Sequence, residues 1–415
     1  MKQRIIMLLL SVVAVQGFAQ LTLERCHELA RRQYPVIKQY ELVRQSKNYT
    51  VSNASKAYLP QVKVSLGANG FTDPIDFPEQ IKAMGMADMK NYLLNGSVQV
   101  NQVIYDGGGI AARKQLAKAQ AEVDENQLNV RLYDINQRVD QLYFGILMLD
   151  EQLKQVKLLQ NDLQLSRNTV EAMLKGGVAN QSDLDAVAVE QVRAEQQEGS
   201  LRASRNSYAR MLGLFIGQEV DEKTQLAKPV MPEVLPDSTS HRPELSYFAA
   251  QSKLLDTQRK ALNSQLNPTI SAFAMGMYHN KVMDIMRPGM IAGGITLSWN
   301  VAPFYTRKND LRNLETKKRQ IESERETFLF NTRLQNQQSA GVVDDLRKKL
   351  EQDTRIITLR ERIHDTSVKK VQNGIESVNE MLRDVNAVSE ARQQKTIHEI
   401  QLLQAIYQLK NINNN

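Results

Sequence analysis

The sequence predicts a mixed fold, in which short strands of a membrane β-barrel alternate with long coiled-coil helices in two structural repeats. Three observations support this prediction. Four runs alternate apolar and polar residues as barrel strands do, a heptad pattern marks very long helices, and the same order of elements occurs twice. The chain has 415 residues, enough for two such copies.

Matching proline positions mark the duplication. Pro35 and Pro60 in the first half are 25 residues apart, and so are Pro243 and Pro268 in the second half. After each second proline come two strand-like runs, a long helical pattern, a glycine turn and a final helix. Such internal repetition predicts a pseudo-symmetric architecture. We divide the mature chain into a first repeat, a proline-containing linker and a second repeat, over residues 20–218, 219–240 and 241–415.

The first 19 residues have the pattern of a secretory signal peptide. Lys2 and Arg4 precede an apolar run over residues 5–15, and small residues follow before Gln20. We therefore expect residues 1–19 to be removed and the rest to be exported. The single cysteine, Cys26, leaves no internal disulfide, so packing and assembly must stabilise the exported fold.

Charge is spread over the sequence rather than concentrated in one segment. The chain carries 53 Lys and Arg against 46 Asp and Glu, a formal net charge of +7. The basic runs at residues 317–319 and 347–349 lie in helical patterns with acidic neighbours, which is typical of solvated helix faces. We therefore expect no nucleic-acid partner.

The four strand candidates alternate apolar and polar residues, as the strands of a membrane barrel do. In the first, Val62, Val64 and Leu66 face opposite to the residues between them, and the second run alternates in the same way. In the third, Phe273 and Met275 oppose smaller apolar residues, so the orientation and register of the later strands stay open. The predicted strands lie approximately at residues 61–71, 92–103, 269–278 and 291–300.

The strongest periodicity belongs to a helix that runs without proline from about Gly109 to Gly177. A second helix of nearly the same length is predicted from about Arg307 to Gly374. At ~1.5 Å per residue each would be on the order of 100 Å long, and such a rod is stable only when it packs against others. Spacings of four and three residues define a coiled-coil seam on the first helix. The seam consists of Leu128, Leu132, Ile135, Val139, Leu142, Ile146, Leu149, Leu153 and Val156.

Glycines punctuate the far end of both long helices. Gly177 and Gly374 supply the left-handed residue that ends a helix and lets the next one return antiparallel. Asp183 and Glu380 each stand six residues after their glycine, in the first turn of the returning helix, where the helix dipole favours a carboxylate. The two acids either only cap these helices or, repeated around a pore axis with Arg383 nearby, also attract cations at an entrance. Both interpretations stay open.

Four strands per chain leave open sheet edges, which lipid does not tolerate, so several chains must close one barrel. Two chains would give eight strands, and side chains fill the interior of a barrel of that size. Three chains would give twelve strands and a lumen. The polar inward faces and the paired long helices favour the open barrel, and therefore a homotrimer.

Three segments resemble the TolC-like outer membrane efflux proteins. Residues 21–30, followed by a Tyr-Pro pair, resemble the opening motif of that family. Residues 103–109 resemble its aromatic-Asp-Gly-Gly step from strand to long helix, and residues 177–184 resemble its turn at the periplasmic tip. The second copy departs from the pattern. Residues 299–304 contain a proline and no glycine, so we expect a strand-to-helix transition of different construction there.

The resemblance implies a homotrimer with a 12-stranded barrel in the outer membrane and a 12-helix tunnel in the periplasm. It implies that the protein is the exit channel of a tripartite efflux or type I secretion system. The implied partners are outer membrane lipid, a periplasmic adaptor protein and an inner-membrane pump such as an RND or ABC transporter. The gate and adaptor-docking surface would lie at the tip. The residues concerned are Gly177, Asp183, Gly374, Glu380 and Arg383. The family often carries two inward acids at the second tip, whereas here Arg383 stands near the second such position.

Other functions find less support in the residues. The five histidines do not have the spacing of metal ligands. The triple glycine at residues 107–109 lacks the Gly-Lys-Ser/Thr ending of a phosphate loop. We therefore expect no catalytic residue, cofactor or metal site. Methionines cluster in the hairpin regions, and although thioethers suit Cu(I), we favour apolar filling. The alternative function is an exported coiled-coil structural protein without a pore. Within the channel hypothesis the cargo stays open among drugs, metals and polypeptides, because it depends largely on the pump.

Overall fold

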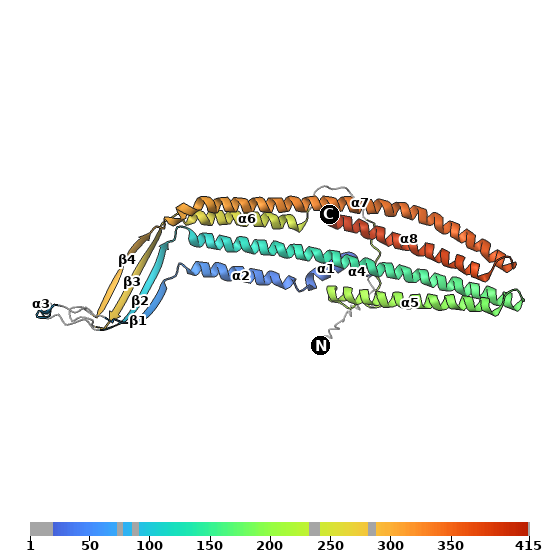
Figure 1. Ribbon diagram of the computed structural model, residues 1–415, viewed down its shortest axis with the longest axis horizontal. Helices are drawn as coiled ribbons and strands as arrows, with labels where there is room; N and C mark the ends of the chain where they lie inside the picture. Colours follow the sequence, from blue (N-terminus) through green and yellow to red (C-terminus); the bar gives the residue numbers. More distant parts are fainter. Residues whose placement is uncertain (1–19, 73–77, 85–90, 232–240, 281–287, 414–415) are drawn as a thin grey trace, which may run out of the picture. The chain divides into compact units, whose positions relative to one another are not determined.

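The computed structural model describes residues 20–72, 78–84, 91–231, 241–280 and 288–413 (Figure 1). The predicted signal peptide lies outside these residues, as do parts of both predicted hairpin loops. The described residues form eight helices and four strands. In chain order these are α1 (Leu23–Gln33), α2 (Ile37–Lys56), β1 (Gln61–Gly70), α3 (Glu79–Lys82), β2 (Tyr92–Tyr105), α4 (Gly109–Lys175), α5 (Gln181–Ile216), α6 (Pro243–Ser264), β3 (Thr269–His279), β4 (Gly289–Ser298), α7 (Ala302–Gln372) and α8 (Val378–Asn413).

The chain divides into two compact units, each of which takes segments from both halves of the sequence. Unit 1 comprises Met1–Ile37, Arg131–Arg242 and Phe330–Asn415. Unit 2 comprises Lys38–Val130 and Pro243–Leu329. The long helices α4 and α7 contribute to both units, so the units are not the predicted repeats, and the division into repeats stays a prediction.

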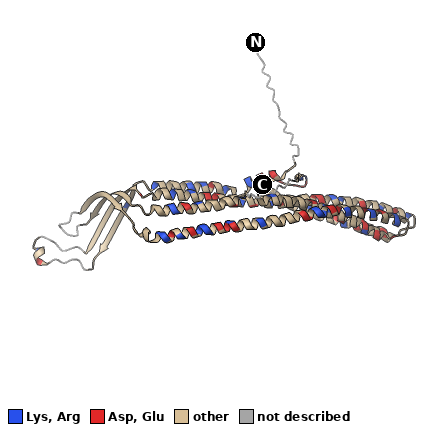
Figure 2. Ribbon diagram, turned by 90° about the horizontal axis from the view of Figure 1, so that it is seen from above, with Lys and Arg blue, Asp and Glu red and all other residues tan. Residues whose placement is uncertain are grey.

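Basic and acidic residues are interspersed along the helices (Figure 2). Many pair within one helix, for example Arg202 with Glu198 at 2.7 Å. Exposed pairs of this kind each contribute little to stability, and they agree with the solvated faces expected from the sequence. None of the described helices carries an apolar stretch long enough to cross a membrane.

Unit 2 contains one antiparallel sheet in the order β1-β2-β3-β4. Across it, Val64 lies opposite Val98, Val98 opposite Gly276, and Gly276 opposite Ile291. Residues that are opposite in register point to the same face. One face, which we call the apolar face, therefore collects most of the aliphatic side chains of the four strands. It includes Val62, Val64, Leu66, Leu94, Val98, Val100, Ile270, Ala272, Ala274, Tyr278, Ile291, Ile295 and Leu297. The register thus fixes the orientation of the third strand, which the sequence left open.

The opposite face of the sheet, which we call the polar face, is mixed in character. It includes Lys63, Ser65, Asn95, Ser97, Gln99, Phe273, Met275, Met277, His279, Met290, Thr296 and Ser298. Local packing agrees with this assignment, because a Cβ atom on Gly294 would lie 3.3 Å from the ring of Phe273. The aromatic ring therefore covers the glycine that lies opposite it in β4.

The first strand-to-helix junction depends on one aspartate and two glycines. The Asp106 carboxylate accepts hydrogen bonds from the backbone N–H of Gly108, at 3.1 Å, and of Ile110, and so satisfies otherwise free donors at the start of α4. Gly107 and Gly108 have φ angles of 68° and 90°, a region that strains other residues. A Cβ on Gly107 would also lie 2.9 Å from the Cβ of Asn267. The tight turn therefore requires glycine.

The second junction is built differently, as expected. No glycine is needed, because the side-chain oxygen of Asn300 accepts from the backbone N–H of Ala302 at 3.1 Å. Trp299 packs edge-on against Phe304. Pro303 is the second helical residue, a position where a missing backbone N–H costs nothing. This explains why α7 begins at Ala302, five residues before the predicted start.

The seam predicted on the first long helix is buried. Leu149 and Leu153 are half-buried, and the other seven members are buried. The same spacing continues beyond the predicted seam through Leu159, Leu163 and Val170, which are also buried. Packing along this seam accounts for much of the apolar core.

Polar side chains buried in unit 1 hold its loops and short helix in place. Arg205 donates to the Asp150 carboxylate at 2.8 Å and to the backbone carbonyls of Asp221 and Thr224 at 2.7 and 2.9 Å. The Tyr143 hydroxyl lies 2.7 and 2.6 Å from the carbonyl oxygens of Leu21 and Ala227. It therefore binds both segments that meet in the isolated parallel bridge between Leu21 and Leu226. These contacts satisfy groups that would otherwise be costly to bury.

The single cysteine is part of the same core. Cys26 is fully buried in α1 as a free thiol. Burial raises the pKa of this thiol to about 12, so the reactive thiolate is scarce at neutral pH. The residue is therefore a small apolar core residue rather than a reactive group.

Candidate functional site at the turns of the helical hairpins

Both helical hairpins turn at the glycine predicted from the sequence. Gly177 follows α4 with a φ of 78°, and Gly374 follows α7 with a φ of 70°. Beyond each glycine a backbone N–H reaches back to the helix: Val178 donates to Met173 and Ile375 donates to Lys370, both at 2.9 Å. This 6→1 bond is the Schellman arrangement, which uses carbonyls at the helix end that would otherwise be free.

The first returning helix starts with a complete capping box. The side chain of Asn180 accepts from the backbone N–H of Asp183 at 3.1 Å, and the Asp183 carboxylate accepts from the backbone N–H of Asn180 at 3.0 Å. Two free donors of α5 are thus satisfied reciprocally. The predicted site residue Asp183 has a defined structural role as a cap.

The second returning helix starts in the same way. The hydroxyl of Ser377 accepts from the backbone N–H of Glu380 at 3.3 Å, and the Glu380 carboxylate accepts from the backbone N–H of Ser377 at 3.0 Å. The hydrogen bonds that this carboxylate accepts from the backbone N–H and the hydroxyl of Ser377, with the positive charges of Arg383 and Lys370, hold the pKa of Glu380 below its usual value. The carboxylate is exposed and stays ionised at neutral pH.

Asn180 and Ser377 were not among the predicted site residues, although the sequence contains their signal. Each precedes its acid by three residues at a helix start, which is the spacing of a capping box. Of the other predicted residues, Arg383 is exposed one turn after Glu380 on α8. The structure therefore places each acid within its own helix start, and the pore role of these residues stays a prediction.

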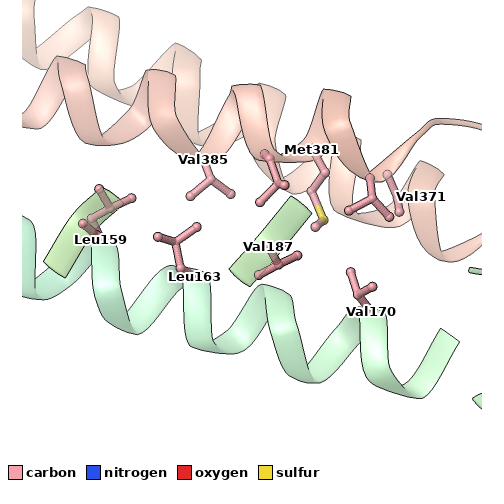
Figure 3. Packing of buried hydrophobic residues seen from close by; sticks show 10 residues of the cluster. Leu159, Leu163, Val170, Val187, Val371, Met381 and Val385 are labelled. Carbon is pink, nitrogen blue, oxygen red and sulfur yellow. The ribbon is translucent and has the colours of Figure 1, made fainter. Parts of the chain in front are cut away.

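Behind the turns, an apolar cluster joins the two hairpins (Figure 3). Leu163 and Val170 of α4, Val187 of α5, Val371 of α7 and Met381 of α8 are each at most 1% exposed. Figure 3 shows these side chains directed toward one another from the four helices. Because the helices share one core, the two turns are held together as one rigid end.

Polar contacts within and between the hairpins reinforce this end. Arg392 of α8 reaches Glu361 of α7 at 2.7 Å and Asp162 of α4 at 3.3 Å. Asn386 of α8 donates to Glu190 of α5 at 3.0 Å. These partners are far apart in sequence, and no local pattern identified them.

We call this end of unit 1 the tip. Its two turns present exposed charged and polar side chains over a packed base, an arrangement suited to binding another protein or an ion rather than to catalysis. Among the described residues, no group of three or more His, Cys, Asp or Glu side chains could hold a metal ion.

Comparison with known proteins gives the context of this architecture. Residues 27–218 match the family model of the outer membrane efflux proteins. No curated protein matches the chain by sequence.

Solved structures share the fold over nearly the whole chain. The outer membrane protein VceC from Vibrio cholerae matches with a TM-score of 0.69 at 11% identity, covering 95% of this chain and 96% of that one. The CmeC outer membrane channel of Campylobacter jejuni has a TM-score of 0.67 at 10% identity, with coverages of 96% and 86%. The open state of the Neisseria gonorrhoeae MtrE outer membrane channel has a TM-score of 0.67 at 11% identity, with coverages of 95% and 89%.

Proposed function

The chain belongs to the outer membrane efflux protein family, and we propose that it forms the exit channel of a tripartite efflux or type I secretion system. It is an outer membrane protein and not an enzyme, in keeping with a family and structural neighbours that are channels. The apolar face of the sheet carries the proposal. Val64, Leu66 and Ile291 are 65%, 86% and 91% exposed there, which suits lipid and not water.

The proposed assembly is a homotrimer. In the described sheet β1 and β4 are edge strands, and exposed edges are not tolerated within lipid. Three copies close a 12-stranded barrel, with the apolar face toward lipid and the polar face toward the lumen. The helical hairpins of the three copies form a 12-helix tunnel in the periplasm.

The proposed partners act at the tip. A periplasmic adaptor protein docks on the exposed turns, and an inner-membrane pump such as an RND or ABC transporter delivers the cargo. The packed base of the tip supports this role, because a docking surface requires a rigid platform. Repeated three times around an axis, Asp183 and Glu380 contribute negative charge at the tunnel entrance, with Arg383 beside it.

Fractionation and mass measurement test the assembly. The mature protein should be recovered from the outer membrane and have the mass of a trimer in detergent. The alternative, an exported coiled-coil protein without a pore, predicts a soluble species from the periplasm and leaves the exposed apolar face of the sheet without a purpose. Recovery as a soluble monomer would reject the channel.

Single-channel recording in planar bilayers tests the gate. Asp183→Asn with Glu380→Gln removes both charges but keeps oxygen acceptors for the capping hydrogen bonds seen here. If the acids line the entrance, this variant should lose cation selectivity at unchanged thermal stability. Asn180→Ala is the matched control, because it removes a cap without changing charge. An unchanged permeability ratio in the double variant would leave the acids as caps only.

A further inference from the structure

Sulfur and imidazole ligands gather on one part of the polar face of the sheet. Met277 of β3 lies directly opposite Met290 of β4 in the register. Met275 and His279 lie two residues to either side of Met277 on the same strand, and so on the same face. Directly opposed Cβ atoms are about 5 Å apart and diagonal ones about 7 Å, distances that long methionine side chains can bridge.

The distribution of methionine between the two faces argues against simple apolar filling. Apart from Gln102 near the end of β2, the apolar face of the described strands is built from Val, Leu, Ile, Ala, Gly and Tyr, whereas Met275, Met277 and Met290 all lie on the polar face. That face also carries Ser97 and Gln99, which lie opposite Met277 and Met275 on β2. Methionines that served only as lipid-facing filler would lie on the other face.

The histidine is oriented as metal-binding histidines are. The Nδ1 atom of His279 lies 2.9 Å from the carbonyl oxygen of Asn280, a bond in which only the ring nitrogen can donate. The neutral ring then carries its proton on Nδ1 and leaves Nε2 with a free lone pair. Metal-ligating histidines typically make this second bond, because it fixes the tautomer and the ring orientation.

We propose that Met275, Met277, Met290 and His279 form a binding site for a soft monovalent cation, Cu(I) or Ag(I). Thioether sulfur favours soft ions, and one imidazole completes a set of three or four neutral ligands. The set contains no carboxylate, so Mg²⁺, Ca²⁺ and Zn²⁺ should bind poorly. The site goes beyond the proposed channel function, and it depends only on the register of β3 and β4.

Silver titration of the tag-free protein in detergent, in a chloride-free buffer, tests the site. The full chain should retain about one Ag(I) per chain after gel filtration, measured by elemental mass spectrometry. The variant with Met275→Leu, Met277→Leu and Met290→Leu should bind Ag(I) at least about tenfold more weakly, since leucine keeps the volume and removes the sulfur. Matched controls are Met84→Leu and Met211→Leu, both at exposed methionines outside the sheet, which should bind as the original does.

A second measurement covers the case in which the triple variant folds poorly. X-ray absorption of the Cu(I)-loaded protein should show sulfur and nitrogen neighbours, and His279→Gln should remove the nitrogen while sulfur remains. Circular dichroism and elution volume verify the fold of each variant. Undiminished silver binding by a folded triple variant, or a copper spectrum without sulfur, would overturn the proposal. Because trimer formation and conductance are measured separately, failure of the site leaves the channel function untouched.

Discussion

The two long helices, α4 and α7, occupy equivalent places in the order of elements but differ in what surrounds them. They have 67 and 71 residues. Along α4, Val139, Tyr143, Phe144 and Ile146 are fully buried by the rest of the chain. The buried residues of α7 are fewer and half of them are polar: Thr332, Val343, Leu346, Asp353, Ser367 and Val371.

The exposed apolar residues of α7 show what this difference means. Ile356, Leu359 and Ile363 are 47%, 45% and 48% exposed, and their spacing of three and four residues places them in one row. A row at this spacing is the pattern of a helix that packs against another helix. The comparison teaches that the apolar seam of α4 is covered mostly by its own chain, although Leu158 and Leu165 stay 45% and 65% exposed. The row on α7, in contrast, presents a surface that, in the proposed trimer, a neighbouring copy would cover.

The largest expected effect is at the centre of the α4 seam. Ile146→Asp places an unpaired charge where the side chain is fully buried, and should lower the free energy of unfolding by about 4 kcal/mol or more. Leu142→Asp should act in the same direction. Thermal unfolding followed by circular dichroism measures both. Asn161→Asp, on an exposed position of the same helix, is the control and should change little. Equal stability of all three variants would show that the seam is not structural.

The next effect concerns the polar core of α7. His398 of α8 lies 2.7 Å from the Asp353 carboxylate, which is only 9% exposed. His398→Leu should cost about 3 kcal/mol, because it leaves a buried carboxylate without its partner. The double variant Asp353→Leu, His398→Leu should recover most of that loss, since apolar packing can replace a buried pair. A double variant as unstable as the single one would show that the hydrogen bond itself, and not the orphaned charge, sets the stability.

A smaller effect should appear in assembly rather than in folding. Ile356→Asp with Ile363→Asp adds two charges to the exposed row of α7, and should weaken trimer formation at least about tenfold while helix content stays unchanged. Light scattering after gel filtration in detergent measures the trimer fraction. Thr358→Asp, an exposed residue turned away from the row, is the matched control. An undiminished trimer would exclude this row from the interface between copies.

The smallest effect is on the local stability of one turn. It should separate the α4–α5 hairpin from the α7–α8 hairpin. Asn180→Ala removes the side-chain acceptor of the first capping box and should destabilise the first turn of α5 by about 1 kcal/mol. Hydrogen exchange of the Asp183 amide should then be roughly fivefold faster, with the start of α8 unaffected. Asn180→Ser keeps a good cap and should exchange normally. Faster exchange at both hairpins would mean that the tip opens as a single unit.

Local patterns in the sequence determined most of the elements. Alternation placed all four strands within a few residues, because each run follows the period of two that a pleated strand imposes. The glycines at the two turns were predictable, since few other residues adopt the left-handed conformation that ends a helix. The carboxylates of Asp183 and Glu380 were predicted at helix starts for the same local reason.

Partners distant in sequence were decided only by the tertiary structure. No residue pattern identified Arg392 as a link among three helices, Arg205 as the anchor of the loop after α5, or His398 as the partner of Asp353. The same holds for β3, whose face became clear only through its pairing with β2 and β4.

The physical reason for this division is the range of the interactions concerned. Periodicity, capping and glycine turns follow from backbone geometry within a few residues, so the sequence by itself determined the strands, the long helices and their ends. Which side chains meet across helices and strands depends on how the elements pack in three dimensions. That packing decided that the seam of α4 is covered by its own chain while the apolar row of α7 is left exposed.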